Sequence, residues 1–405
     1  MRHLLSAVLL ALPLAAWAQT TPLTETEAVR RGLARPDLAD QELGRVESAK
    51  ADALAAGLPP NPTLGYTRDR KRGTPDLTDE TWQLSQTFDL SGRRGLRREA
   101  ADIRVEAAYA GNNQHRGEWA AEIRRSFHQT LFKQEAVLAT ETWVKRFSRV
   151  ERIVNKLARV GEASGYDRRR LARERQTAEA RLNNEKADLD RAAERLAALV
   201  GTSGKAAETV TGVLRPNAPP PLENALSRIE RRPDLQVLAR RAEAADLEGR
   251  AAARGWVPDV TLGVGPKRID NGIIRENGTE VSLSIPLPVF DRQQAGQQRA
   301  AAEALNARGE LSLTRARAEG DLRGLHRQVE RLVAAASDYR SRAVGESAEL
   351  LRIAEAAYQG GESSLLELLD AYRGALEAEM TALDLEWKAR QARIDYDLLT
   401  GSVTE

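Results

Sequence analysis

The sequence predicts a mainly α-helical chain that carries four short β-strands. The same order of elements occurs in two consecutive copies. Charged residues make up 30% of the chain and aromatic residues only 4%, which is typical of long helices and coiled coils. Four segments alternate apolar and polar residues, which is the pattern of strands with one apolar face. A series of short markers also recurs at an offset of about 200 residues, which indicates an internal duplication.

The first residues have the features of a secretory signal. Arg2 precedes an apolar run from Leu4 to Ala16, and Ala16-Trp17-Ala18 forms a small-x-small cleavage site. We therefore expect residues 1–18 to be a signal peptide and the mature chain to begin near Gln19. Such a chain is exported, which predicts a bacterial periplasm or outer membrane as its location.

Composition excludes several classes of protein. The formal charge is +2 in the full chain and becomes +1 without Arg2, which argues against a nucleic-acid partner. The absence of Cys excludes a disulfide scaffold, a thiolate metal site and a lipid anchor on an N-terminal Cys. After the signal no stretch approaches eighteen apolar residues, so contact with a membrane would have to involve β-strands.

The first copy of the plan is predicted to span residues 19–202. A helical region runs from Leu23 to about Leu58, and strands follow at about 63–69 and 80–90. Ser91-Gly92-Arg93 then opens a helix that runs to about Arg159, roughly 100 Å at 1.5 Å per residue. A Gly-rich break precedes a return helix that ends near Val200.

Residues 203–221, which are rich in Pro, are predicted to link the two copies. Arg35-Pro36-Asp37-Leu38 returns as Arg232-Pro233-Asp234-Leu235, and Gly161-Glu162 returns as Gly361-Glu362. The second copy therefore spans 222–405, with strands at about 260–266 and 279–287. After the second strand, Asp291 is expected to accept the first free amides of a further helical stretch of roughly sixty residues.

Four amphipathic strands cannot close a barrel across a bilayer, because at least about eight are needed and open edges leave backbone groups unpaired in lipid. Two chains would supply eight strands and three chains twelve. The polar strand faces would then line water and the apolar faces would meet lipid. The alternative is a soluble domain in which the two hairpins pack on each other and the helices form a coiled-coil spacer.

The order and spacing of these elements resemble the TolC family of outer-membrane efflux factors. The resemblance rests on the duplication, on the two strand-to-helix passages Leu84–Arg93 and Leu283–Arg292, and on the Gly161 and Gly361 turns. It implies a trimeric twelve-stranded β-barrel, four strands from each chain, continued by a coiled-coil α-helical tunnel in the periplasm. The second passage, with Pro-Leu-Pro-Val-Phe-Asp-Arg, looks most like the branch that serves heavy-metal resistance-nodulation-division pumps.

The resemblance also implies partners: a homotrimer in outer-membrane lipid, a periplasmic adaptor protein and an inner-membrane pump. The two turns would form the periplasmic mouth of the tunnel. The expected adaptor contacts are Gly161, Ser164, Gly361 and Ser364, and the two serines also have the right positions to cap the returning helices.

Charged residues near the start of each returning helix are candidates for a periplasmic gate. In the family, acidic residues here face a narrow aperture, so Asp167, Glu367 and Asp370 would form rings of carboxylates in a trimer. Arg170 stands where Asp370 stands in the second copy, which allows a mixed ring or an Arg–Asp latch. The alternative is that these carboxylates only stabilise helix N-termini.

The sequence predicts no enzyme, no cofactor and no metal site. His115, His128 and His326 have no partner at ligand spacing, and no phosphate-binding loop or nucleophile elbow is present. The expected function is a passive exit duct for a tripartite efflux pump, with heavy-metal cations as the expected substrates. Multidrug efflux, type I protein secretion and a periplasmic adaptor or scaffold remain as alternatives.

Overall fold

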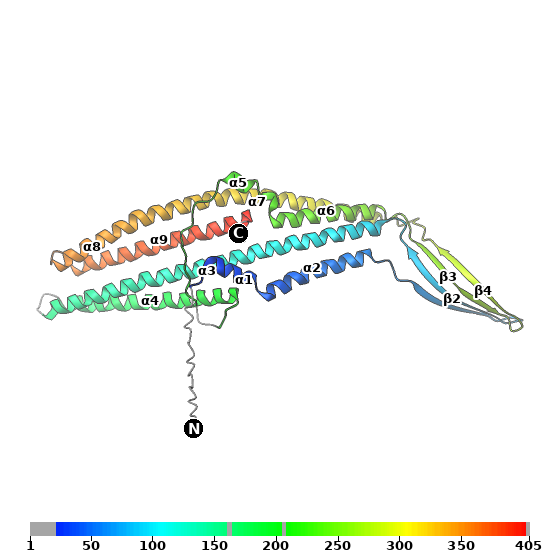
Figure 1. Ribbon diagram of the computed structural model, residues 1–405, viewed down its shortest axis with the longest axis horizontal. Helices are drawn as coiled ribbons and strands as arrows, with labels where there is room; N and C mark the ends of the chain where they lie inside the picture. Colours follow the sequence, from blue (N-terminus) through cyan, green and yellow to red (C-terminus); the bar gives the residue numbers. More distant parts are fainter. Residues whose placement is uncertain (1–21, 160–163, 205–207, 402–405) are drawn as a thin grey trace, which may run out of the picture.

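The chain forms one long, narrow body with helical hairpins at one end and β-strands at the other (Figure 1). The structure is a computed structural model that describes residues 22–159, 164–204 and 208–401. The predicted signal peptide, residues 1–18, and Gly161 lie outside these described residues. The helical regions and the four strands occur in the predicted order, so the mainly α-helical prediction with a duplicated plan is confirmed.

The first repeat begins with two helices, continues with a β-hairpin and ends with two long antiparallel helices. Its elements are α1 (Glu25–Leu33), α2 (Pro36–Gly57), β1 (Thr63–Lys71), β2 (Leu77–Phe88), α3 (Arg93–Arg159) and α4 (Gly165–Val200). α3 is 67 residues long and packs against α2, α4, α6 and α9, so it is the helix around which the others assemble.

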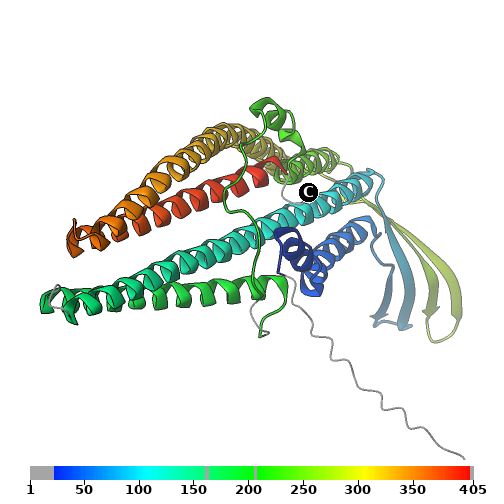
Figure 2. The same cartoon turned by 60° about the vertical axis from the view of Figure 1, so that its left-hand side comes forward.

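The second repeat follows the same order but begins with shorter pieces of helix. Its elements are α5 (Leu222–Leu226), the 3₁₀ turn η1 (Ile229–Arg231), α6 (Pro233–Ala253), β3 (Val260–Asp270), β4 (Arg275–Ser284), α7 (Gln294–Tyr339), the π-helical turn η2 (Arg340–Val344), α8 (Gly345–Gln359) and α9 (Leu365–Thr400). Figure 2 shows the α3–α4 and α8–α9 hairpins as two arms that run toward the same end of the molecule.

The four strands form one antiparallel sheet in the order β1-β2-β3-β4. The two hairpins therefore join edge to edge through β2 and β3, with Leu84 opposite Val264, and do not pack face to face as in a soluble sandwich. The register places the apolar side chains on one face, where they are all exposed: Leu64, Tyr66, Trp82, Leu84, Phe88, Leu262, Val264, Val281 and Leu283.

The opposite face of the sheet is polar and internally hydrogen-bonded. The Gln83 amide donates to Ser282 Oγ at 2.6 Å, and the hydroxyls of Thr87 and Thr261 lie 2.9 Å apart. A Cβ atom on Gly265 would lie 1.7 Å from the Trp82 carbonyl oxygen, so only glycine permits this approach of β3 to β2. The alternation read from the sequence thus becomes one apolar and one polar surface.

All four strands differ from their predicted bounds. β1 and β3 end later, at Lys71 and Asp270, β2 ends earlier, at Phe88, and β4 begins earlier, at Arg275. β4 ends at Ser284 and does not reach residue 287, because Pro286 and Pro288 carry no N–H group with which to continue pairing. β2 begins at Leu77 and not at residue 80, because the polar residues before Glu80 still pair with β1 and β3. Backbone pairing between β1 and β2 therefore continues beyond the residues whose apolar and polar side chains alternate clearly.

The two strand-to-helix corners are built differently. Asp89 accepts the backbone N–H groups of Ser91 and Arg94, each at 2.9 Å, and so caps the start of α3. Asp291 instead accepts the N–H of Gln293 at 2.7 Å, and Gln293 adopts a left-handed φ of 63° before α7 begins. The predicted cap at Asp291 therefore forms a turn ahead of the helix and does not bond to the helix itself.

The second long helix contains a π-helical turn, η2, that its heptad pattern did not predict. After the turn the buried positions move by one residue, so Leu351 is 4% exposed whereas Leu350 is 62% exposed. The offset between the repeats likewise changes, from 199 residues at Leu84 and Leu283 to 200 at Ser164 and Ser364. One extra residue in the second copy, accommodated by the π turn, explains both changes.

Candidate functional site at the helical ends

The ends of α3, α4, α8 and α9 that flank the two turns lie at the end of the molecule farthest from the strands (Figure 1). At the start of α4, Ser164 Oγ accepts the N–H of Asp167 at 3.1 Å, and the Asp167 carboxylate accepts the N–H of Ser164 at 3.3 Å. This reciprocal arrangement is a capping box, which satisfies two backbone donors that the helix leaves free.

The second hairpin has the same arrangement at the start of α9. Ser364 Oγ accepts the N–H of Glu367 at 3.3 Å, and the Glu367 carboxylate accepts the N–H of Ser364 at 2.8 Å. Gly361, in the turn before it, has a φ of 77°, a left-handed conformation that glycine adopts without strain. Asp167 and Glu367 are therefore engaged as caps while remaining at the surface.

Asp370 and Arg170 lie one turn further along their helices. Asp370 is exposed and Arg170 is half-buried. Within the described part of the chain no ion pair joins them, and Arg170 Nε has no hydrogen-bond partner there. The structure thus brings Ser164 into contact with Asp167 and Ser364 into contact with Glu367, whereas Asp370 and Arg170 form no such pair with each other.

Behind the turns, one apolar core joins the two hairpins. It contains residues from α3, α4, α8 and α9, among them Phe147, Leu171, Leu351, Leu369 and Tyr372. Phe147 and Leu369 are fully buried, and the rings of Phe147 and Tyr372 lie 5.6 Å apart. The position of one hairpin end is therefore coupled to that of the other by packing.

An ion pair that the sequence analysis missed also joins the hairpins. Arg373 on α9 lies 2.5 Å from the carboxylate of Glu174 on α4, whose side chain is only 7% exposed. The sequence did contain a signal, because Glu174 occupies a seam position between Leu171 and Ala178, where an apolar residue is expected. A carboxylate in an apolar seam calls for a cationic partner.

Two tyrosines lie near the same end. The Tyr372 hydroxyl donates to Glu355 at 2.6 Å. Burial and the nearby Asp167 carboxylate raise the pKa of the Tyr358 hydroxyl above its ordinary value. Tyr358 on α8 and Asp167 on α4 thus place a donor and an acceptor on opposite hairpins.

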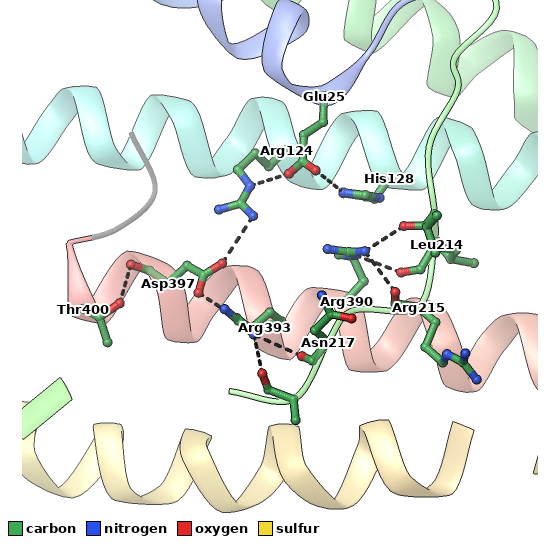
Figure 3. A network of polar contacts seen from close by, with 12 residues as sticks. Glu25, Arg124, His128, Leu214, Arg215, Asn217, Arg390, Arg393, Asp397 and Thr400 are labelled. Carbon is green, nitrogen blue, oxygen red and sulfur yellow. Dashed lines mark hydrogen bonds and ion pairs between the residues drawn. The ribbon is translucent and has the colours of Figure 1, made fainter. Parts of the chain in front are cut away.

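A second polar cluster lies at the waist of the molecule, where α1, α3, α9 and the linker meet (Figure 3). Glu25 on α1 accepts from Arg124 at 2.5 Å and lies 3.1 Å from Nε2 of the buried His128, both on α3. Arg390 on α9 donates to the carbonyl oxygens of Leu214 and of its neighbours in the linker. These contacts bind both repeats to the linker that crosses them.

Burial and charge set the protonation of this waist cluster. Burial alone would raise the pKa of Glu25, but His128 and Arg124 lower it to about 2. Burial lowers the pKa of His128, against the opposing effect of Glu25. At neutral pH the cluster therefore holds an ionised Glu25 and a neutral His128.

Two further properties bear on what the molecule can do. In residues 22–159, 164–204 and 208–401, no three His, Asp or Glu side chains gather closely enough to hold a metal ion. None of the helices in these ranges combines the length and the apolar character needed to cross a membrane.

Comparisons with known proteins agree with this architecture. The profile of the outer membrane efflux protein family matches residues 33–202 and 226–402. The cobalt-zinc-cadmium resistance protein CzcC of Cupriavidus metallidurans is 27% identical over 88% of this chain and 84% of its own length. The nickel-cobalt-cadmium resistance protein NccC of Alcaligenes xylosoxydans is 25% identical over 71% of this chain and 66% of its own.

The fold is also that of a solved membrane protein. The crystal structure of a membrane protein from Pseudomonas aeruginosa superposes with a TM-score of 0.78 over 94% of this chain and 91% of that one, at 20% identity. The family match covers both repeats with their strands and helical hairpins. The chain therefore belongs to the TolC family of outer membrane efflux proteins.

Proposed function

We propose that three copies of this chain form a passive exit duct for heavy-metal cations. The curated relatives that it resembles are named for resistance to cobalt, zinc, cadmium and nickel. The sequence resemblance, through the strand-to-helix passage that ends at Arg292, favours the same branch. A wide aqueous duct selects its cargo weakly, so the substrate assignment rests on the relatives.

The observation that carries the duct is the four-stranded sheet. Its apolar face is exposed along every strand, and β1 and β4 have unpaired outer edges within the described chain. An open edge in lipid leaves N–H and C=O groups unsatisfied, so the sheet needs partners on both sides. Three copies would join β4 of one chain to β1 of the next and close twelve strands.

The helical hairpins would then extend the barrel as a tunnel into the periplasm. Their ends would meet a periplasmic adaptor, and an inner-membrane pump would supply the energy. Gly161, Ser164, Gly361 and Ser364 are the proposed adaptor contacts. The caps at Ser164 and Ser364 support this role, because they fix the start of each returning helix.

The same end is the proposed gate. Three-fold symmetry would turn Glu367 and Asp370 into rings of carboxylates, with Asp167 and Arg170 beside them. Replacing both acids, Glu367→Ala with Asp370→Ala, is expected to increase the conductance of the reconstituted channel about twofold and to reduce its cation selectivity. Conductance and selectivity unchanged from the parent channel would contradict a gate at these residues.

A deletion strain tests the function as a whole. We expect the strain to become sensitive to cobalt, zinc or cadmium salts and to regain resistance when the full chain is restored. Sensitivity to drugs instead would favour multidrug efflux, and loss of a secreted protein would favour type I secretion. Fractionation is the companion measurement, because a protein washed from outer membranes by high salt would contradict the barrel.

A further inference from the structure

Five basic residues form a continuous stripe on α3 near its turn. The basic stripe consists of Lys145, Arg149, Arg152, Lys156 and Arg159. All five side chains are exposed, and their spacing of four, three, four and three residues keeps them on one line along the helix. The line is about 21 Å long at 1.5 Å per residue.

The stripe faces away from the rest of the chain. The buried positions of this part of α3 are Trp143, Phe147, Val150 and Val154. Four stripe residues each follow one of these by two positions, which turns them about 200° around the helix. The stripe therefore lies opposite the core that joins the two hairpins.

No carboxylate neutralises the stripe. Among the residues that the structure describes, none of the five side chains forms an ion pair, whereas the nearby Glu151 pairs with Arg175 at 3.3 Å. Like charges three and four residues apart destabilise a helix. A surface that carries this cost without an internal counter-charge is suited to a counter-charge from another molecule.

The second repeat provides an internal control. The matching positions, 200 residues on, are Gly345, Glu349, Arg352, Ala356 and Gln359, and there Glu349 pairs with Arg352 at 2.6 Å. Residues 145–175 contain 11 basic and four acidic residues, whereas residues 345–375 contain two basic and six acidic residues. The stripe therefore occurs in one hairpin only, and the hairpin fold does not require it.

We infer that the basic stripe is a docking surface for an acidic α-helix of a protein partner, one whose carboxylates repeat at heptad spacing. A straight line of cations parallel to a helix axis matches a helix packed alongside, as flanking charges do in coiled coils. Thr142, Ser148 and Asn155, which lie beside the stripe, are polar, and the apolar neighbour Ile153 is half-buried. A membrane-surface helix would carry an apolar row there.

This inference rests on the proposed function only for the identity of the partner, which would be the periplasmic adaptor.

The probe for the stripe itself is a synthetic helical peptide with Glu at heptad spacing, and its matched control is the same peptide with Gln. Binding to the purified full chain in detergent is measured by fluorescence anisotropy at 50 and 300 mM NaCl. The expected result is binding of the Glu peptide that weakens at 300 mM NaCl, because salt screens exposed charges.

The variants separate the stripe from charge in general. Reversing Arg149, Arg152 and Lys156 to Glu is expected to weaken binding of the Glu peptide at least about tenfold. The matched control reverses Arg323, Arg327 and Arg331, which are exposed on α7 and lack ion pairs among the described residues, and should change binding less than about twofold. Replacing the three stripe residues with Gln gives the same test without new negative charge, in case reversal impairs folding.

Two results would overturn the inference. One is equal loss of binding in the stripe and control variants. The other is stripe-dependent binding to vesicles of phosphatidylethanolamine and phosphatidylglycerol without binding of the Glu peptide, which would assign the surface to lipid. Stripe-dependent peptide binding in a chain whose deletion leaves metal resistance unchanged would support the docking surface and refute the proposed function.

Discussion

The two helical hairpins of this chain share one backbone plan and differ in charge. Both turns are followed by Ser with an acidic residue three positions later, and both serines form the same capping box. The α3–α4 hairpin is nevertheless strongly basic near its turn, and the α8–α9 hairpin is acidic. The cap depends on a few neighbouring residues that both repeats share, whereas the surface charge differs between the repeats.

The waist shows the same contrast. In the first repeat, buried His128 and Arg124 meet Glu25, whereas in the second repeat His326 Nε2 lies 3.0 Å from the Pro220 carbonyl oxygen. In addition, His326 Nδ1 lies 3.5 Å from the Glu330 carboxylate, so the two histidines meet different partners in the two repeats. The following changes test how far the repeats are equivalent, beginning with the largest expected effect.

The shared core should respond equally to a change in either hairpin. Phe147→Ala and Leu369→Ala each empty a fully buried site, so each should lower the free energy of unfolding by about 3 kcal/mol. Denaturant unfolding in detergent, followed by circular dichroism, measures the loss. Leu350→Ala, at an exposed site on α8, is the control and should cost less than about 0.5 kcal/mol. If Leu369→Ala behaves like that control, the hairpins do not share one core.

The ion pair between the hairpins should matter more than pairs within one. Glu174→Gln leaves Arg373 without its carboxylate and should cost about 2 kcal/mol. A double-mutant cycle with Arg373→Gln measures the coupling energy. The control pair, Arg175 with Glu179 at 3.2 Å, lies on one helix at the surface and should couple by about 0.3 kcal/mol. Equal coupling energies in the two pairs would show that the Glu174–Arg373 ion pair does not specifically stabilise the contact between the hairpins.

Acid should weaken the first repeat through its waist cluster. The lowered pKa of Glu25 contributes stability above pH 4.5 that is lost as the pH falls toward 2. The lowered pKa of His128 favours its neutral form, so stability also begins to fall below pH 6.5. The expected loss between pH 7 and pH 3 is about 1.5 kcal/mol.

Substitutions at the waist separate these two contributions. Unfolding curves of Glu25→Gln should lose the part of the pH dependence below 4.5, and those of His128→Gln the part that begins near 6.5. If the free energy of unfolding depends on pH identically in the parent chain and in Glu25→Gln, Glu25 is not the group that loses stability in acid.

The caps should give the smallest effect, equal in the two hairpins. Ser164→Ala and Ser364→Ala each remove one hydroxyl acceptor and should cost about 1 kcal/mol despite the opposite charge around them. Hydrogen exchange at the amides of Asp167 and Glu367 reports the loss of each cap directly. Faster exchange in only one of the two variants would show that the local charge, and not the cap, holds that turn.

Sequence reasoning recovered the features that neighbouring residues determine. It placed the end of α3 at Arg159 and the end of α4 at Val200, and it found the duplication and the capping serines. The end of β4 at Ser284 was also within reach, because Pro286 alone stops the ladder. The π turn at Arg340–Val344 could have been inferred from the change of offset between the repeats, but heptad spacing alone does not reveal it.

The sequence by itself determined the helices and the strands with one apolar face, because periodicity is a property of consecutive residues. Only the tertiary structure decided that the two β-hairpins form one sheet, that Arg373 reaches Glu174, and that Glu25 meets His128. These contacts join separate helices or strands whose residues are 100 to 200 positions apart in the sequence. Their formation depends on how long helices pack and in which register strands pair, which no single stretch of sequence specifies.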